Sequence, residues 1–291
     1  MRLDNERESD NVEDMRGASG GCGGISGGTL GIGGVVVALI ASYFLGIDPS
    51  VLLGMLSGDS GPGTPAQVQQ GPAPRPPQGD QKAIMVSRVL ASTEDTWSQV
   101  FREAGKTYQP PKLDLYTRSL PTACGTGQAA MGPFYCPVDR KVYIDLAFFQ
   151  LMKDRFHATG DFAQAYVVAH EVGHHVQTLL GITDQMDARR ARASKAQANA
   201  LSVRLELQAD CFAGVWASRY DKAKHFLDPG DVEGALAAAA AIGDDTLQRQ
   251  ARGEVVPDSF THGTSAQRVS WLRRGLESGS VQACDTFSAQ M

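Results

Sequence analysis

Two histidines and a glutamate near the middle of the chain have the spacing of a metal site. His170 and His174 are four residues apart in the segment HEVGH, so a helix would carry both imidazoles on one face, one turn apart. Two imidazoles placed in this way can bind one zinc ion at about 2.1 Å each. Glu171 is rotated by roughly 100° around the helix, where it can take a proton from a water molecule on the metal. The segment therefore predicts zinc-dependent hydrolysis.

The HExxH pattern also arises by chance, in about one chain in a hundred of this length, and a polar cluster can be satisfied by hydrogen bonds alone. The surroundings of the segment favour a metal. Its neighbours include Val167, Val168 and Val172, and burying polar or charged groups on such an apolar helix is costly unless they have a partner. A metal ion supplies that partner.

A catalytic zinc ion takes three protein ligands and keeps one position open for water. Glu206 is the candidate third ligand, and Asp210 follows it by four residues, on the same face of the helical stretch RLELQADCFAGVW. Asp210 can accept the second N–H of a ligating imidazole and so fix its tautomer. The alternative is that both are exposed acids on an amphipathic helix. The apolar neighbours Leu205, Leu207 and Phe212 favour burial instead.

This arrangement predicts one Zn²⁺ per chain and a peptide or protein substrate, with Glu171 as the general base toward a zinc-activated water. Two alternatives stay open. One is a non-catalytic, membrane-tethered binding module whose zinc only holds the fold, and the other is a zinc amidase acting on a cell-wall amide. A structural zinc normally has four protein ligands, whereas the sequence offers three with clear spacing and a glutamate placed as a base.

Several stretches of the chain resemble a family of bacterial proteins described as putative neutral zinc metallopeptidases. The resemblance spans most of residues 81–287, and the stretches that carry it are AHEVGHHVQ (169–177), ELQADCFAGVW (206–216), TACGTGQAAMGPFYCPVDRKVYIDL (122–146) and THGTSAQRVSWLRRG (261–275). At a wider remove, HExxH followed by ExxxD is similar to the gluzincin arrangement of thermolysin-like enzymes. That resemblance implies a short sheet above the active-site helix, with an edge strand that holds an extended peptide.

Two further residues become candidates through resemblance to membrane-bound metallopeptidases, in which a His followed by an Arg occupies a comparable place. Here these are His262 and Arg268, in SFTHGTSAQR, and either is a candidate for stabilising the oxyanion. The alternative is that Thr264 or Ser265 caps the last helix and His262 only packs nearby. His175 points about 100° away from His174, which favours a packing function over metal binding.

The elements that must position these residues form an α+β arrangement, expected to be a mostly helical, zincin-like domain with a small sheet. Apolar spacing predicts the helices, and alternation predicts the strands. We expect strands near 112–117, 133–136 and 141–145, a helix continuing from 145 to 151, and helices over 83–104, 161–180, 187–221, 231–251 and 264–277.

Four cysteines lie in this folded region, and a fifth, Cys22, lies in the glycine-rich N-terminal segment. Four cysteines allow three disulfide pairings, and sequence alone does not choose among them. We favour Cys124 with Cys136, which would close a short loop across a hairpin, and Cys211 with Cys284. The alternative is four buried free thiols.

The N-terminal part differs in composition from the rest. Residues 1–28 are polar and glycine-rich and are predicted to be a disordered cytoplasmic tail. Residues 29–47 carry no charge, and at a helical rise of about 1.5 Å they reach roughly 28 Å, which predicts one transmembrane helix. Residues 48–80 form a Gly/Pro-rich linker, and residues 81–288 the metallopeptidase domain.

Orientation and partners follow from charge. Arg2, Arg7 and Arg16 precede the apolar segment and no Lys or Arg follows it until Arg75, so the positive-inside rule predicts a cytoplasmic N-terminus and a domain in the periplasm or outside the cell. Disulfides persist in such a compartment. The net charge of −5 over 291 residues gives no basic face for a nucleic acid.

Overall fold

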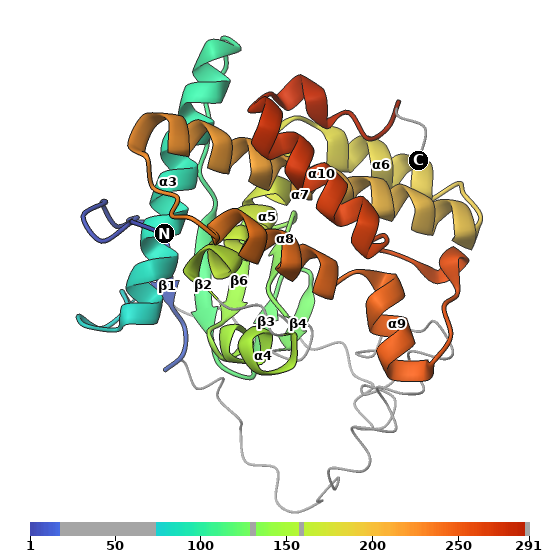
Figure 1. Cartoon of the computed structure of the whole chain (residues 1–291), viewed down its shortest axis with the longest axis horizontal. Coiled ribbons are helices and arrows are strands. Elements are labelled where there is room, and N and C mark those ends of the chain that lie inside the picture. The colour runs from blue at the N-terminus through green and yellow to red at the C-terminus, as the bar shows by residue number, and fades with distance from the viewer. Residues whose placement is uncertain (18–73, 129–131, 157–159, 289–291) are drawn as a thin grey trace, which may run out of the picture.

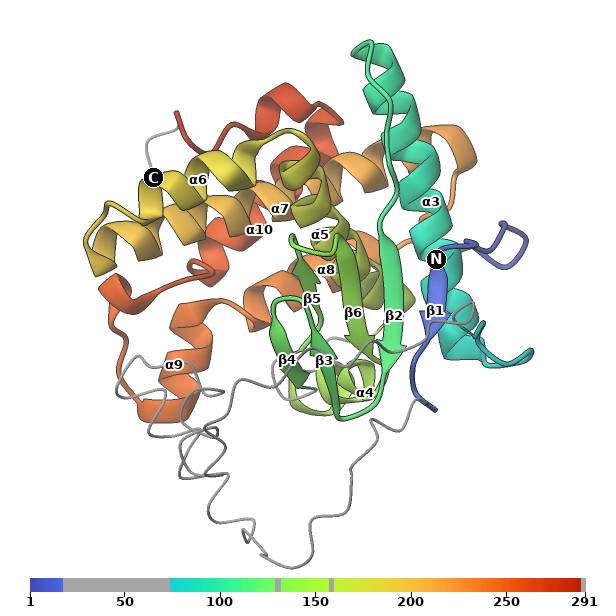
Figure 2. The same cartoon turned by 180° about the vertical axis from the view of Figure 1, so that it is seen from behind.

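The computed structural model describes residues 1–17, 74–128, 132–156 and 160–288. Its larger sheet has four short strands in the order β1-β2-β6-β5, seen side by side in Figure 2. The first three strands are parallel, and β5 pairs antiparallel with β6 at one edge. A separate antiparallel hairpin, β3 and β4, lies beside this sheet. The strands are β1 (Val12–Asp14), β2 (Lys112–Tyr116), β3 (Ser119–Thr122), β4 (Gly125–Gln128), β5 (Phe134–Cys136) and β6 (Lys141–Asp145).

Helices make up most of the rest, so the α+β prediction of a mostly helical domain with small sheets is confirmed. α7 packs against both α5 and α10 (Figure 1), and its centre is almost completely buried. The helices are α3 (Gln81–Glu103), α4 (Ala147–Phe156), α5 (Asp161–Leu179), α6 (Ile182–Arg190), α7 (Lys195–Lys224), α8 (Asp231–Ala241), α9 (Asp244–Arg252) and α10 (Ser265–Ser278), with 3₁₀ turns at η2 (Pro257–Ser259) and η3 (Val281–Cys284).

Two long helices predicted from the sequence are each interrupted. The stretch 187–221 is divided between α6 and α7, because Ser194 begins a new helix with a capping box to Gln197. The stretch 231–251 is divided at Gly243, where a side chain would overlap the backbone of Ser265. This close approach brings the start of α9 beside the start of α10, a contact that apolar periodicity does not reveal.

Residues 1–17 are ordered against the domain, so the prediction of a disordered tail is wrong for this segment. Leu3 and Val12 are buried in the main core, and β1 pairs with β2. The buried carboxylate of Glu94 on α3 accepts hydrogen bonds from Arg7 (2.9 Å), Ser9 (2.5 Å) and Asn11 (2.8 Å). These contacts explain the polar composition of the segment: its polar side chains form hydrogen bonds with the buried Glu94 carboxylate instead of with water.

Strand β1 also bears on the predicted membrane topology. A strand cannot pair with its sheet across a bilayer, because every backbone hydrogen bond would have to cross the apolar core. A cytoplasmic N-terminus with the domain outside is therefore incompatible with the pairing of β1 and β2. Residues 29–47 and most of the predicted linker lie outside the described residues. Within the described ranges, no helix has the length and apolar character needed to span a membrane.

Candidate metal centre

The HEVGH segment lies in the middle of α5, where it faces α7. The two helices approach closely at Gly173, since a Cβ there would lie 3.0 Å from the carbonyl oxygen of Ala209 and 3.1 Å from its Cα. Ala209 lies between Glu206 and Asp210 along α7. The absence of a side chain at position 173 therefore lets α7 bring both acids against the two histidines.

Three candidate ligands converge at this crossing. The Nε2 atom of His170 lies 3.1 Å from one carboxylate oxygen of Glu206, and Nε2 of His174 lies 3.5 Å from the other. One ligand atom from each residue falls within a group no wider than 4.8 Å. The structure thus brings together the three residues that the sequence nominated, from segments 32 or more positions apart in the chain.

Both imidazoles have their second nitrogen occupied. Nδ1 of His170 lies 2.8 Å from Oδ1 of Asp210, as predicted for that residue. Nδ1 of His174 lies 2.9 Å from the side-chain oxygen of Gln177, which the sequence analysis did not single out. Gln177 is three residues after His174, so both lie on the same helix face. This spacing is the feature of the sequence that could have identified Gln177 as the partner of His174. With Nδ1 directed at Asp210 or Gln177, Nε2 is the nitrogen of each ring that faces the Glu206 carboxylate.

Arg268 is buried behind Asp210 rather than open to the site. Its Nε and one terminal nitrogen each donate to the Asp210 carboxylate over 2.9 Å, and Tyr166 donates to the same carboxylate over 2.6 Å. The Arg268 side chain is 4% exposed and bound to Asp210, which favours a structural function for this residue over contact with a substrate oxyanion. α10 carries Arg268 this close because Gly214 and Gly275 let the backbones of α7 and α10 meet directly.

The electrostatics of the metal-free cluster follow from these contacts. Burial raises the pKa of Asp210, but Arg268 and His170 outweigh it and lower that pKa to about 2. Burial lowers the pKa of His170, yet Asp210 and Glu206 raise it to about 10. Burial also raises the pKa of Glu171 above its ordinary value, the direction that suits a group taking up a proton near neutral pH.

His262 lies in the segment immediately before α10, close enough to Glu206 to interact with its carboxylate. The backbone N–H groups of Thr261, His262 and Gly263 donate to one oxygen of Asp244, at 2.6–3.0 Å, and the His262 Nδ1 lies 3.3 Å from the other. Burial lowers the pKa of His262, but Glu206 and Asp244 raise it above its ordinary value. The His262 side chain remains 51% exposed. Thr264 caps α10 in a capping box with Gln267, so the helix cap and the histidine coexist.

His175 has a packing function, as expected. Its Nε2 lies 2.6 Å from the carbonyl oxygen of Gln109, and its Nδ1 lies 3.1 Å from the Tyr135 hydroxyl. Burial lowers the pKa of His175 to about 4, so the ring is neutral, donating from Nε2 and accepting at Nδ1. It thereby ties β5 to α5 one residue from a candidate ligand.

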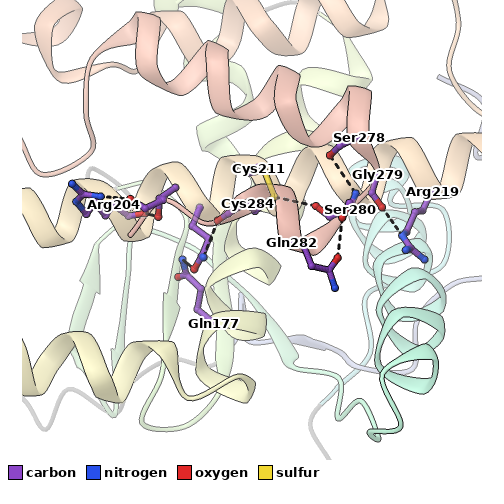
Figure 3. The surroundings of a disulfide bond; sticks show 11 residues. Gln177, Arg204, Cys211, Arg219, Ser278, Gly279, Ser280, Gln282 and Cys284 are labelled. Atoms are coloured by element: carbon purple, nitrogen blue, oxygen red, sulfur yellow. Dashed lines mark hydrogen bonds between the residues drawn. A yellow bond between two sulfur atoms is a disulfide. The ribbon is translucent and has the colours of Figure 1, made fainter. Parts of the chain in front are cut away.

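Both favoured disulfides are present. Cys124–Cys136 joins the β3–β4 turn to the end of β5, and Cys211–Cys284 joins α7 to η3 (Figure 3). Cys211 follows Asp210 on α7, and the carbonyl of its partner Cys284 accepts a hydrogen bond from Gln208 on the same helix. The alternative of four free thiols is excluded in this structure.

The residues present fit a zinc ion of the catalytic type. Two imidazole nitrogens and one carboxylate are the donors of a His₂Glu zinc shell, and catalytic zinc sites use three such ligands. Among the described residues, this trio is the only group of three or more His, Cys, Asp or Glu side chains close enough to bind one metal ion. Both imidazoles are also oriented by hydrogen bonds from behind, as metal-binding histidines usually are.

Comparison with known proteins agrees with this chemistry. The family described as "Putative neutral zinc metallopeptidase" matches residues 1–287, and the chain belongs to that family. It is 52% identical over 293 residues to the uncharacterized protein YpfJ of Escherichia coli K12, covering 99% of each chain. It is 42% identical over 220 residues to the uncharacterized protein Mb2605 of Mycobacterium bovis, covering 72% of this chain and 73% of that one. No solved structure matches.

Proposed function

We propose that this protein is a zinc-dependent metallopeptidase that hydrolyses peptide bonds, with His170, His174 and Glu206 as the zinc ligands. The observation that carries the proposal is the convergence of two imidazole Nε2 atoms on one carboxylate, with each Nδ1 already hydrogen-bonded. Nε2 of each ring is therefore the atom that would bind the cation, releasing any proton it carries, as a His₂Glu site requires.

Zinc, when bound, lowers the pKa of a coordinated water toward 7 and polarises a carbonyl group. Glu171 then acts as the general base: its carboxylate takes a proton from the attacking water and passes it to the leaving amine. The raised pKa of Glu171 makes the protonated form accessible between these two steps. Asp210 keeps His170 in the tautomer that presents Nε2, and Arg268 compensates the buried charge of Asp210.

His262 is the proposed donor to the oxyanion. It is half-exposed and close enough to Glu206 for that carboxylate to raise its pKa, and Asp244 both holds its backbone and contacts its ring. A protonated imidazole beside the ligand shell can donate a hydrogen bond to the negative charge that develops on the carbonyl oxygen.

Strand β5 is the proposed binding edge for the substrate. It is the terminal strand of the four-stranded sheet in the described part of the chain, and Tyr135 links it to His175 beside the metal centre. An extended peptide can add to a sheet edge through backbone hydrogen bonds. This edge favours a peptide over a cell-wall amide, and a library of both substrate types would test the choice.

The decisive experiment compares two substitutions. Glu171→Gln should keep stoichiometric zinc and folding but abolish peptide hydrolysis, whereas His170→Ala should lose the metal. Glu277→Gln, which changes an exposed acid on α10, is the matched control and should behave like the wild type. Zinc binding by the wild type without cleavage of any peptide in a broad screen would favour the non-catalytic module. Stoichiometric zinc in His170→Ala would overturn the site itself.

We also propose that the domain lies outside the cytoplasm, in association with the membrane. Two disulfides favour an oxidising compartment, and the uncharged segment 29–47 has the length for contact with a bilayer. Because β1 pairs with β2 of the domain sheet, this proposal includes residues 1–17 in the same compartment as the domain.

A further inference from the structure

A chain of buried amide groups connects the second histidine of the candidate site to the C-terminal disulfide. We propose that Gln177, aligned by Gln208 and by the disulfide-bonded segment around Cys284, is the positioning residue for His174. The proposal rests on the proposed function of His174 as a metal ligand. It makes the Cys211–Cys284 disulfide a support of the metal centre as well as of the fold.

Backbone carbonyl groups fix the direction of the whole chain, since a carbonyl oxygen only accepts. The carbonyl of Cys284 accepts from the Gln208 side-chain nitrogen at 2.9 Å, which turns the Gln208 oxygen toward Gln177. The Gln177 nitrogen donates to that oxygen over 3.1 Å and to the Leu205 carbonyl over 2.7 Å. Both of its protons are then used, and the Gln177 oxygen must face His174.

The consequence for His174 is a single tautomer. The Gln177 oxygen is an acceptor, so Nδ1 of His174 donates to it over 2.9 Å, and Nε2 is the ring nitrogen left facing Glu206 to bind a metal. Gln177 and Gln208 are 1% and 5% exposed, so water cannot readily replace either amide. The carboxylate of Asp210 does the same for His170, but with a negative charge in place of a neutral amide.

The disulfide holds the far end of this chain. Figure 3 shows the Cys211–Cys284 bond between α7 and the C-terminal turn, with Gln177 extending toward that turn from below. Beyond the turn, Thr286 is fully buried and its hydroxyl donates to the Arg204 carbonyl over 2.7 Å. If Cys211 and Cys284 were reduced, the carbonyl of Cys284 would no longer be held against α7 by a covalent bond. The acceptor of Gln208 would then be held only by noncovalent contacts such as that of Thr286, and its position would be less well fixed.

The test separates tautomer control from simple packing. In the full-length chain, Gln208→Met and Gln177→Met should each weaken zinc binding roughly 10–100-fold, the usual effect of losing a hydrogen-bond partner behind a ligand. Gln177→Glu restores an acceptor for His174 while losing the donors to Leu205 and Gln208. The zinc affinity of Gln177→Glu should therefore stay within roughly threefold of wild type. If Gln177 acted only through packing, Gln177→Glu should instead weaken zinc binding at least as much as Gln177→Met.

Zinc affinity is measured by chelator competition, and the His174 tautomer by the nitrogen chemical shifts of the zinc-loaded protein. Removing the disulfide with Cys211→Ala and Cys284→Ala should also weaken zinc binding, while Cys124→Ala with Cys136→Ala removes the other disulfide as the control. Reduction of the Cys124→Ala, Cys136→Ala protein opens the Cys211–Cys284 disulfide alone and should weaken zinc binding in the same way. Thermal unfolding of each metal-free variant shows whether it is folded.

Three negative results would contradict different parts of the proposal. If His170→Ala also keeps its zinc, the proposed function has failed, and the proposal that Gln177 positions His174 fails with it. If His170→Ala loses zinc while Gln177→Met and Gln208→Met bind it as tightly as wild type, the metal site stands and the positioning proposal is overturned. Weak binding by Gln177→Glu equal to that of Gln177→Met would likewise overturn it.

Discussion

Arg268 and Asp210 form a buried ion pair directly behind a candidate zinc ligand, joined by two hydrogen bonds of 2.9 Å. Asp210 is fully buried and also contacts Nδ1 of His170. The orientation of that histidine therefore depends on a residue from α10 that is too deeply buried to reach the substrate. The pair explains why a buried acid can lie beside Glu206 in the same apolar helix, since Arg268 compensates its charge.

Replacing Arg268 should lower the unfolding free energy of the protein more than it lowers the catalytic rate. Arg268→Gln removes the larger of the two positive charges that offset the buried Asp210 carboxylate, and breaking a buried ion pair typically costs about 3–5 kcal/mol of unfolding free energy. Urea unfolding of the metal-free protein measures the loss, with Arg273→Gln at an exposed position of α10 as the control. If Arg268→Gln kept wild-type stability and lost only kcat, that result would favour contact between Arg268 and the oxyanion instead.

Zinc should stabilise the folded protein through the three converging ligands. A ligand that binds only the native state at a hundred times its Kd adds about 2.7 kcal/mol to the unfolding free energy, so the melting temperature should rise with zinc concentration. Glu171→Gln should show the same rise, because it is not one of the proposed ligands, and Glu206→Gln should show a much smaller one. A chelator should reverse the effect. If zinc raised the melting temperature of Glu206→Gln as much as that of the wild type, Glu206 would not be a zinc ligand.

Sequence reasoning found the parts of the site that a helix face can specify. His170, Glu171 and His174 follow from i, i+4 spacing, and Glu206 and Asp210 follow from the same rule on a second helix. The spacing could not show that Gly173 brings those helices together. Nor could it show that Arg268 faces inward, since a single arginine in an amphipathic helix is normally exposed.

The same limit explains the errors in the fold. The polar segment 1–17 has the composition of a disordered tail, and its order comes from partners more than 70 residues away, such as Glu94. The break at Gly243 depends on a contact with Ser265, again between distant parts of the chain. Periodicity reports what an element buries, but it does not report which element covers it.

Substitution of His262 should affect the rate more than zinc binding. Removing one oxyanion donor typically lowers kcat by about 10²–10³-fold, so we expect His262→Ala to show that loss with near-normal zinc content and KM. Asp244→Asn, which weakens the hold on the His262 backbone and ring, should give a smaller decrease. Steady-state kinetics with metal analysis measures both. If kcat were unchanged in His262→Ala, His262 would not stabilise the oxyanion and would have only a structural function in its loop.

The ion pairs of Arg16 should make docking of the N-terminal segment sensitive to acid. Arg16 contacts Asp14 and also Asp80, the N-cap residue of α3, at 2.6 Å each. Its hydrogen bonds lower the pKa of Asp14, and they lower that of Asp80 despite the opposing effect of burial.

Groups with lowered folded-state pKa values stabilise the protein above their ordinary pKa of 3.8, and that contribution is lost as the pH falls through the folded values. Arg16→Gln should therefore cost about 1 kcal/mol at pH 6, with the difference from wild type shrinking below about pH 4. Urea unfolding across this pH range measures it. A difference that stays constant down to pH 3 would show that Arg16 acts through packing.

The pairing of β1 with β2 makes a sharp prediction about compartments. Asp4 is almost fully exposed in the N-terminal segment, with its side chain 97% exposed, and Val138 is 72% exposed between β5 and β6. A cysteine placed at either position, in a chain with Cys22 replaced by serine, should react with a membrane-impermeant thiol reagent applied from outside the cytoplasmic membrane. Both positions should be labelled equally, because a strand and its sheet must share one side of the bilayer.

Opposite accessibility would contradict the pairing and restore a single crossing between the two segments. A control cysteine in a known cytoplasmic protein shows that the membrane is intact during labelling. Protection of both sites until the cells are lysed would place the domain in the cytoplasm. That outcome would contradict the argument from disulfides while leaving the pairing of β1 unaffected. The experiment therefore tests the fold of the N-terminal segment separately from the compartment of the domain.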